Sequence, residues 1–165
     1  MTKKIWGGRF KNITNKKVEK FSSSLDIDKN LYAFDIQGSI AHVEMLSKQK
    51  IISVSDKRKI VKSLNQIHKQ IEKGRFEFAV ELEDIHMNIE QAVTKRIGNS
   101  GKKVHTARSR NDQVVTDVKL YIKDIVGNLR KDLVALEKNI VKNAEKNLSL
   151  AIPFYTHLQS AQPVL

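Results

Sequence analysis

Two short polar segments of this 165-residue chain carry side chains that could bind anions or move protons. The first covers residues 103–113 and includes Arg108, Arg110 and Asn111. Two arginines two positions apart project to the same side of an extended backbone, where their guanidinium groups could grip a dicarboxylate. Asn111 or Asp112 would lie at a helix N-terminus, which favours anions. The alternative is a polar turn in which one of these two residues caps the helix.

The second polar segment lies between Pro153 and Pro163 and includes Thr156, His157 and Gln159. A histidine held between a hydroxyl and an amide is fixed in one tautomer and can exchange a proton near neutral pH. This arrangement is typical of a general acid or base. The alternative is a connecting loop whose histidine is simply exposed.

Apolar residues at spacings of three and four predict the helices that position these segments. The predicted helices cover residues 31–49, about 56–73, 84–98 and about 111–147. Ser53 offers an N-cap for the second helix, and Gly74 offers its stop signal. Residues 99–102 are expected to form a turn.

The last predicted helix is too long to be buried within a chain of this size. At 1.5 Å per residue its roughly 36 residues span ~54 Å, and no proline interrupts it. Gly127 is its one weak point, at a cost of ~1 kcal/mol relative to Ala. Its single apolar stripe requires other long helices, from further sequence or from other subunits. We therefore expect a fragment of a larger helical protein. The stripe comprises Val114, Val118, Ile122, Ile125, Leu129, Leu133, Leu136, Ile140 and Ala144.

Composition excludes several classes of protein and leaves one alternative open. The chain has no cysteine, which excludes disulfides, thiolate zinc sites and thiol nucleophiles, and its five histidines are not spaced as metal ligands, so no metal site is expected. No apolar run approaches the ~20 residues that span a bilayer, and the basic N-terminus lacks the apolar stretch of a signal peptide. A cytoplasmic protein without a membrane partner is expected.

The formal net charge of +12 makes a basic helical nucleic-acid-binding module an alternative function. Lysine dominates the 30 basic residues, and lysine is also the usual solubilising residue of exposed helix faces, whereas nucleic-acid contacts favour arginine. We therefore interpret most of the excess as solvated helix surface and expect no nucleic-acid partner. Nucleic-acid binding would instead weaken steeply as salt is added.

Six motifs in the order of the chain resemble the argininosuccinate lyase family of the fumarase/aspartase superfamily. The resemblance covers the whole chain, and the segments WGGRF and TARSRND are similar to this family rather than to the adenylosuccinate lyase or fumarase families. Ala107 departs from the family, which usually has glycine there. The motifs are Trp6–Phe10 (WGGRF), Ser24–Asp28 (SLDID), Asp35–His42 (DIQGSIAH), Glu83–His86 (EDIH), His105–Asp117 (HTARSRNDQVVTD) and Tyr155–Pro163 (YTHLQSAQP).

The resemblance implies the reversible elimination of argininosuccinate to arginine and fumarate, without a cofactor. It places Ser24, Asn111 and Thr156 in contact with the substrate, and Arg110 and Arg108 at the carboxylates that become fumarate.

The resemblance also assigns the proton acceptor. His157 matches the catalytic histidine, either as the direct base or as a residue that orients or relays protons while a serine beyond residue 165 abstracts the proton. His86 with Asp84 forms a second polar pair with a structural or substrate-positioning role. Trp6 and Phe10 would pack an N-terminal arm.

The expected fold is all-α, with a small N-terminal helical domain at residues 1–104 and the start of a long-helix central bundle at residues 105–165. The family implies a homotetramer with active sites shared between subunits, so Asn111 and His157 of one site would come from different chains. The alternative within the same fold is a non-enzymatic, δ-crystallin-like member. Release of fumarate by the intact protein would separate the enzyme from this alternative.

Overall fold

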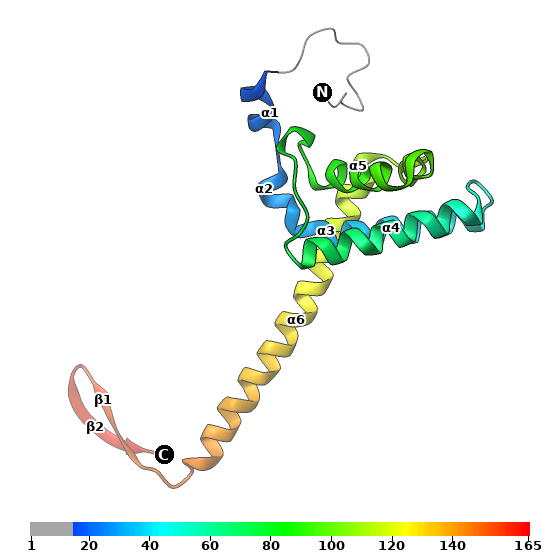
Figure 1. Ribbon diagram of the computed structural model, residues 1–165. Helices are drawn as coiled ribbons and strands as arrows, with labels where there is room; N and C mark the ends of the chain where they lie inside the picture. The colour runs from blue at the N-terminus through cyan, green and yellow to red at the C-terminus, as the bar shows by residue number, and fades with distance from the viewer. Residues whose placement is uncertain (1–14) are drawn as a thin grey trace. The chain divides into compact units, whose positions relative to one another are not determined.

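The computed structural model describes residues 15–165, which divide into two compact units after Tyr121 (Figure 1). The WGGRF motif, with Trp6 and Phe10, lies outside the described residues. No helix among residues 15–165 is long and apolar enough to cross a membrane. The first unit contains α1 (Lys16–Ser22), α2 (Leu25–Asp28), η2 (Lys29–Leu31), α3 (Tyr32–Lys48), α4 (Val54–Glu72), η3 (Val80–Leu82), α5 (Ile85–Ile97), η4 (Gly98–His105) and the first third of α6 (Arg110–Lys146).

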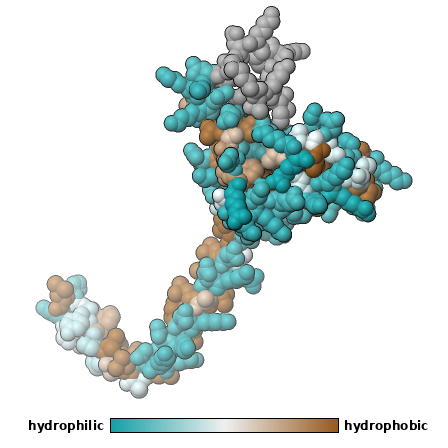
Figure 2. Space-filling model, viewed as in Figure 1, coloured by the Kyte–Doolittle hydropathy of each residue, from teal (hydrophilic) through white to brown (hydrophobic). Residues whose placement is uncertain are grey.

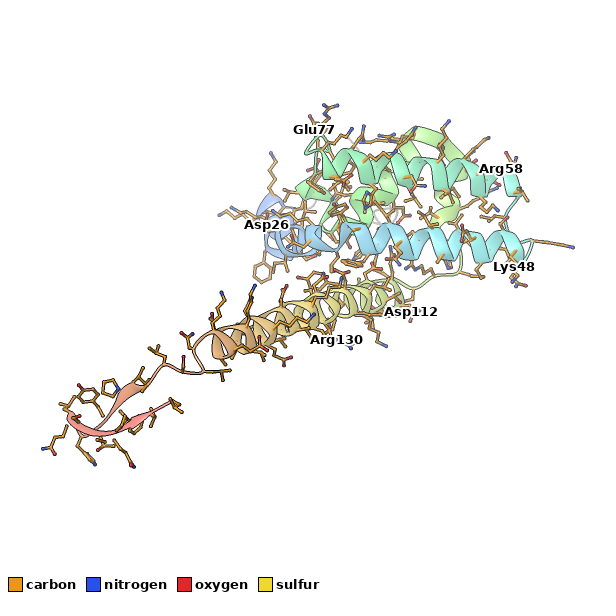
Figure 3. The ribbon with its side chains drawn as sticks, turned by 90° about the horizontal axis from the view of Figure 1, so that it is seen from below. Asp26, Lys48, Arg58, Glu77, Asp112 and Arg130 are labelled. Atoms are coloured by element: carbon orange, nitrogen blue, oxygen red, sulfur yellow. The ribbon has the colours of Figure 1, made fainter. Side chains whose placement is uncertain are left out.

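Helices α3 and α4 lie antiparallel, and α5 packs against both (Figure 1). In Figure 3, Lys48 and Arg58 mark one end of the α3–α4 pair, and Asp26 and Glu77 mark the other. The predicted apolar stripes of these three helices form the core, which confirms the helical part of the predicted fold. The buried core residues are Leu25, Ile36, Val43, Leu46, Ile52, Ile60, Leu64, Ile67, Ile85, Ile89, Val93 and Val104.

The local end signals of these helices act as the sequence predicts. The Ser53 hydroxyl accepts a hydrogen bond from the Asp56 amide at 3.0 Å and caps α4. Gly74 follows the end of α4 with φ = 64°, and Gly98 follows α5 with φ = 61°, conformations that glycine adopts without strain. The predicted bounds of α3, α4, α5 and α6 are therefore confirmed to within about two residues.

The turn predicted at residues 99–102 is wrong, because these residues belong to the 3₁₀ helix η4. Side-chain contacts hold η4 on α4: Ser100 Oγ donates to Asp56 at 2.7 Å, and Lys103 Nζ lies 2.6 Å from the same carboxylate. A Cβ at Gly101 would come within 2.7 Å of the Thr94 backbone. Only glycine allows η4 to approach α5 this closely.

Helix α6 runs for 37 residues without a break, as predicted, and passes through Gly127, whose missing Cβ would meet nothing within 4 Å. From Ile122 onward every residue of this helix is exposed. Ile122, Leu133 and Ile140 are 52%, 51% and 59% exposed. Figure 2 shows apolar side chains along the helix. The predicted stripe therefore lies on the surface of the second unit rather than in a core.

The second unit also contains an antiparallel hairpin of β1 (Ile152–Thr156) and β2 (Gln159–Val164), where the sequence predicted only a loop. Pro153 and Pro163 face each other in this register, and a bulge lies between Pro153 and Tyr155. Such paired prolines are typical of edge strands, because proline donates no hydrogen bond. Over residues 15–165 the fold is thus helical apart from this hairpin. The predicted domain boundary at residues 104/105 stays a prediction.

Candidate functional site

Ser24 is an exposed residue whose amide and hydroxyl both make hydrogen bonds near the start of α5. Its amide donates to the Glu83 carbonyl at 2.9 Å, and its hydroxyl donates to Asp28 Oδ2 at 2.6 Å. The other oxygen of Asp28 accepts from the Ile85 amide at 3.2 Å. Burial raises the pKa of Asp28, while the hydrogen bond from Ser24 opposes this rise. The carboxylate of Asp28 therefore joins Ser24 to the N-terminus of α5.

Glu83 adopts a backbone conformation that is rare for residues other than glycine. Its φ is 69° and its ψ is −47°, and the Asp84 amide donates across it to the Leu82 carbonyl at 2.8 Å, which describes a γ-turn. Asp84 then caps α5, its Oδ1 accepting from the Met87 amide at 2.6 Å. The strained turn directs the Glu83 carbonyl towards Ser24.

His86 lies between two buried carboxyl groups from helices α3 and α6. Its Nδ1 lies 3.0 Å from Asp35 Oδ1 and 3.4 Å from Asp117 Oδ2. The three side chains are at most 2% exposed. Gln113 donates from Nε2 to Asp35, whereas neither oxygen of Asp117 accepts a hydrogen bond from a donor in the described part of the chain. We call Asp35, His86 and Asp117 the buried triad.

Burial and mutual charge move the pKa values of the triad in different directions. Burial and the negative charge of Asp35 raise the pKa of Asp117 to about 7. Burial alone would raise the pKa of Asp35, but hydrogen bonds from His86 and Gln113 hold it below its ordinary value. Burial alone would lower the pKa of His86, but Asp35 raises it above the ordinary value. The triad therefore favours a charged His86–Asp35 pair beside a protonated Asp117.

The triad could also be considered as a metal site. Among residues 15–165, Asp35, His86 and Asp117 each offer one possible ligand atom, and these atoms lie within 4.8 Å of one another. Its closest pair is separated by hydrogen-bond distance, and Asp35 Oδ1 already receives two protein donors. The arrangement is that of a proton-sharing network, in which a metal ion would have to displace hydrogen bonds that are already made.

We predict that Asp117→Asn changes the pH dependence of stability. A folded-state pKa near 7 means that the folded protein keeps a proton that the unfolded chain releases above its model value of 3.8. The contribution of Asp117 is therefore present at low pH and is lost as the pH rises from about 4 to about 7, by up to ~3 kcal/mol in the wild type. Asparagine can donate to Asp35 as a protonated Asp117 would, without titrating. Relative to wild type, the variant should thus gain stability over this range.

Urea unfolding of the full-length protein and of the variant at pH 5 and pH 8 measures this difference. The variant's midpoint should move upward relative to that of wild type at the higher pH. Titration of groups away from the triad is common to both proteins and cancels in the comparison, whereas Asp35 and His86 titrate together with Asp117. A difference that does not change with pH would show that Asp117 is not protonated in the folded state.

The two arginines of the first polar segment bind different helices. Arg108 Nη1 donates to Ser39 of α3 at 3.1 Å, while Arg110 Nη2 donates to Glu90 of α5 at 3.1 Å. Arg110 Nε also lies 4.0 Å from Asp84. Because Arg110 is the first residue of α6, the two arginines are not successive positions of an extended strand. Their role at the carboxylates of a substrate stays a prediction.

The loop before α6 is held in a strained conformation. Ala107 has φ = 53°, in the left-handed region that costs a non-glycine residue roughly 1–2 kcal/mol. The expected capping by Asn111 or Asp112 is wrong. The hydroxyl of Ser109 instead accepts a hydrogen bond from the backbone N–H of Asn111 at 3.2 Å. Asn111 itself is an exposed residue of the first turn of α6. The departure from glycine at position 107 thus falls where the backbone favours glycine.

Thr156 and His157 belong to the second unit, at the turn of the β1–β2 hairpin. Thr156 pairs with Gln159, and the two residues between them, His157 and Leu158, have φ values of 50° and 62°. Two-residue hairpin turns of type I′ require positive φ at both central positions and normally use Asn or Gly there. A histidine in such a turn costs about 1 kcal/mol or more, which makes His157 a candidate functional residue; its catalytic role stays a prediction.

The structure gathers some predicted site residues and leaves others apart. Around the N-terminal half of α5 lie Ser24, Asp84, His86 and Arg110. The side chain of Arg108 contacts Ser39 of α3. Sequence reasoning assigned no role to Asp28 or to the two acids of the triad. One signal could have found Asp117: it lies four residues after Gln113, which places two polar side chains on one face of an otherwise amphipathic helix.

Comparison with known proteins places the chain among lyases. A family model described as lyase matches residues 8–165. The argininosuccinate lyases of Geotalea daltonii and Geobacter metallireducens are each 52% identical over 162 residues, which is 98% of this chain and 35% of theirs. That of Syntrophotalea carbinolica is 52% identical over 165 residues, 100% of this chain and 36% of its own. The chain thus spans about a third of the length of these relatives.

Proposed function

The chain belongs to the lyase family, and on this premise we propose that the full-length protein is an argininosuccinate lyase. The proposed reaction is the reversible elimination of argininosuccinate to arginine and fumarate. The observation that carries the proposal is 52% identity to argininosuccinate lyases over nearly the whole chain. The side chains to which the resemblance assigns roles in this chain lie in the matching segments, and the following steps use them.

The first step removes a proton from the carbon beside a carboxylate of the succinyl group. The electron pair moves into that carboxylate and forms an aci-carboxylate dianion. The pair then returns to form the double bond of fumarate, the carbon–nitrogen bond breaks, and the departing guanidino nitrogen of arginine takes up a proton. Because negative charge builds up on the carboxylate, catalysis depends on donors and cations that are already oriented towards it.

We assign His157 as the proton acceptor, acting directly or by relay. Its position in a strained turn supports this role, since such strain persists where a functional orientation is needed. Asn111 and Thr156 would donate hydrogen bonds to the substrate. Arg110 and Arg108 would stabilise its carboxylates, although in this structure they bind Glu90 and Ser39, so that binding would require these contacts to be exchanged or shared.

The assay of full-length protein for fumarate tests this proposal. Purified protein incubated with argininosuccinate should produce fumarate, followed by its ultraviolet absorbance, and arginine in equal amounts. A protein that assembles but releases neither product would instead be a non-enzymatic member of the family. A separate experiment tests the nucleic-acid alternative. Titration of the protein with duplex DNA at several salt concentrations should show no salt-dependent binding.

We further propose that the full-length protein is a cytoplasmic homotetramer that shares its active sites between subunits. The support is the exposed apolar face of α6, because a stripe of this length is stable in water only when other helices cover it. In this arrangement Asn111 and His157 of one site come from different chains. Neither nucleic acid nor membrane is a partner.

Mixing two inactive variants tests whether the sites are shared. Asn111→Ala and His157→Asn should each be nearly inactive as homotetramers, because every site lacks one required group. Mixed tetramers contain some sites built only from unmutated segments. Denaturing the two variants together and refolding them should therefore restore a measurable fraction of wild-type activity. If the mixture forms tetramers yet is no more active than its parents, both segments serve a site from one chain.

A further inference from the structure

We propose that Asp28 is a positioning residue, which fixes the Ser24 hydroxyl so that Ser24 meets the substrate as an acceptor of N–H hydrogen bonds. The inference rests on the proposed function, because that function makes Ser24 a substrate contact. The inference adds the direction of the hydrogen bond between Ser24 and the substrate. That direction decides which part of the substrate Ser24 can bind.

All the hydrogen atoms that Ser24 can donate are already used within the protein. Its amide donates to the Glu83 carbonyl at 2.9 Å, and its hydroxyl donates to Asp28 Oδ2 at 2.6 Å. A serine hydroxyl has one hydrogen and two lone pairs. With that hydrogen directed to a carboxylate, the exposed Ser24 oxygen offers a ligand only lone pairs. A substrate carboxylate would find no donor there.

Asp28 is itself held in place, so it can impose this orientation. Its second oxygen accepts from the Ile85 amide at 3.2 Å, at the positive end of the α5 dipole. The γ-turn at Glu83 fixes the neighbouring carbonyl, which also accepts from Ser23 Oγ at 3.0 Å. Ser24 is thus held by Asp28 of α2, which itself binds the first amide of α5, and by the Glu83 carbonyl of the γ-turn before α5.

The charge around Ser24 agrees with a cationic ligand group. The charge nearest to Ser24 is the carboxylate of Asp28, which accepts its hydroxyl hydrogen. Asp84 adds a second negative charge near Asp28, which His86 and Arg110, the latter 4.0 Å from Asp84, offset only in part. Charged donors make the stronger hydrogen bonds to such an oxygen. The guanidinium or ammonium of the arginine portion is therefore the group that Ser24 should bind, whereas the two carboxylates that become fumarate should not reach it.

Asp28→Asn in the full-length protein is the test, with Asp26→Asn as its matched control. Both acids lie on α2, but Asp26 is fully exposed and lies 4.0 Å from Lys29. The amide group that the first substitution introduces can donate to Ser24 Oγ and so reverse the polarity of that hydroxyl. We expect the KM for argininosuccinate to rise about tenfold or more, with kcat changed less. The inhibition constant of arginine should rise in parallel, while that of fumarate stays within about twofold.

A double variant separates positioning from simple support of the fold. If Asp28 acts through Ser24, then Asp28→Asn should have little further effect on KM in a Ser24→Ala background. Equal effects in both backgrounds, or a loss of arginine and fumarate inhibition together, would overturn the proposal. So would kinetics of Asp28→Asn that match those of Asp26→Asn. Failure of the wild-type protein to release fumarate would refute the proposed function instead, before any variant is compared.

Discussion

Replacing His157 by asparagine should lower the kcat of the full-length protein by a factor of about 10² to 10⁴. Asparagine keeps a polar side chain of similar reach but cannot exchange a proton near neutral pH. The KM for argininosuccinate should stay within a few-fold of wild type, because the loss falls on the transition state rather than on binding. Steady-state measurement of fumarate release gives both constants.

The conformation of the hairpin turn suits asparagine, so the substitution should change the chemistry without disturbing the fold. His157 has φ = 50°, and asparagine tolerates the left-handed conformation better than histidine does. The turn should therefore survive, and any loss of kcat reports on chemistry rather than on folding. Leu158→Asn is the matched control, because Leu158 is the other turn residue and is 99% exposed. A large rise in KM with little change in kcat would make His157 a binding residue.

Asp35→Ala should destabilise the full-length protein by about 3–5 kcal/mol, the cost of breaking a buried ion pair. Asp35 receives hydrogen bonds from His86 and Gln113 and is 1% exposed. Its removal leaves the Gln113 amide without its acceptor and leaves His86 with Asp117 alone, in a site that water reaches poorly. The urea midpoint should fall accordingly, as followed by circular dichroism.

Glu44→Ala on the same helix controls for loss of an acidic side chain. Glu44 is exposed, and surface substitutions of this kind usually change stability by less than about 0.5 kcal/mol. Equal midpoints for Asp35→Ala and Glu44→Ala would mean that the buried triad contributes nothing to stability.

Sequence alone predicted the helices because their signals are local. The apolar period of α4 and its cap at Ser53 lie within one stretch of chain, and the same holds for its stop at Gly74. The β1–β2 hairpin could not be predicted in this way. It has a proline in each strand, and its turn residues His157 and Leu158 are not the usual Asn and Gly.

The site was predictable only where the family resemblance reached it. Resemblance pointed to Ser24 and His157, but the groups that hold Ser24 come from two segments of the chain. The Ile85 amide meets Asp28 from 57 positions away, and Gln113 meets Asp35 from 78 positions away. Such pairings depend on how helices dock, which no short window of sequence records. The sequence therefore does not indicate that Asp35, Gln113 and Asp117 are buried.

The uncovered part of α6 makes the stability of this protein a matter of mass action. From Ile122 to Lys146 the helix has no packing partner within the described residues, so only its own backbone hydrogen bonds and propensity hold it. Most of the stability of helices in proteins comes from packing of an amphipathic face rather than from propensity, and this segment lacks such packing. In the proposed tetramer, association supplies the missing burial, and the free energy of unfolding then rises with the logarithm of protein concentration. Dilution would act on this helix as a denaturant acts on an ordinary core.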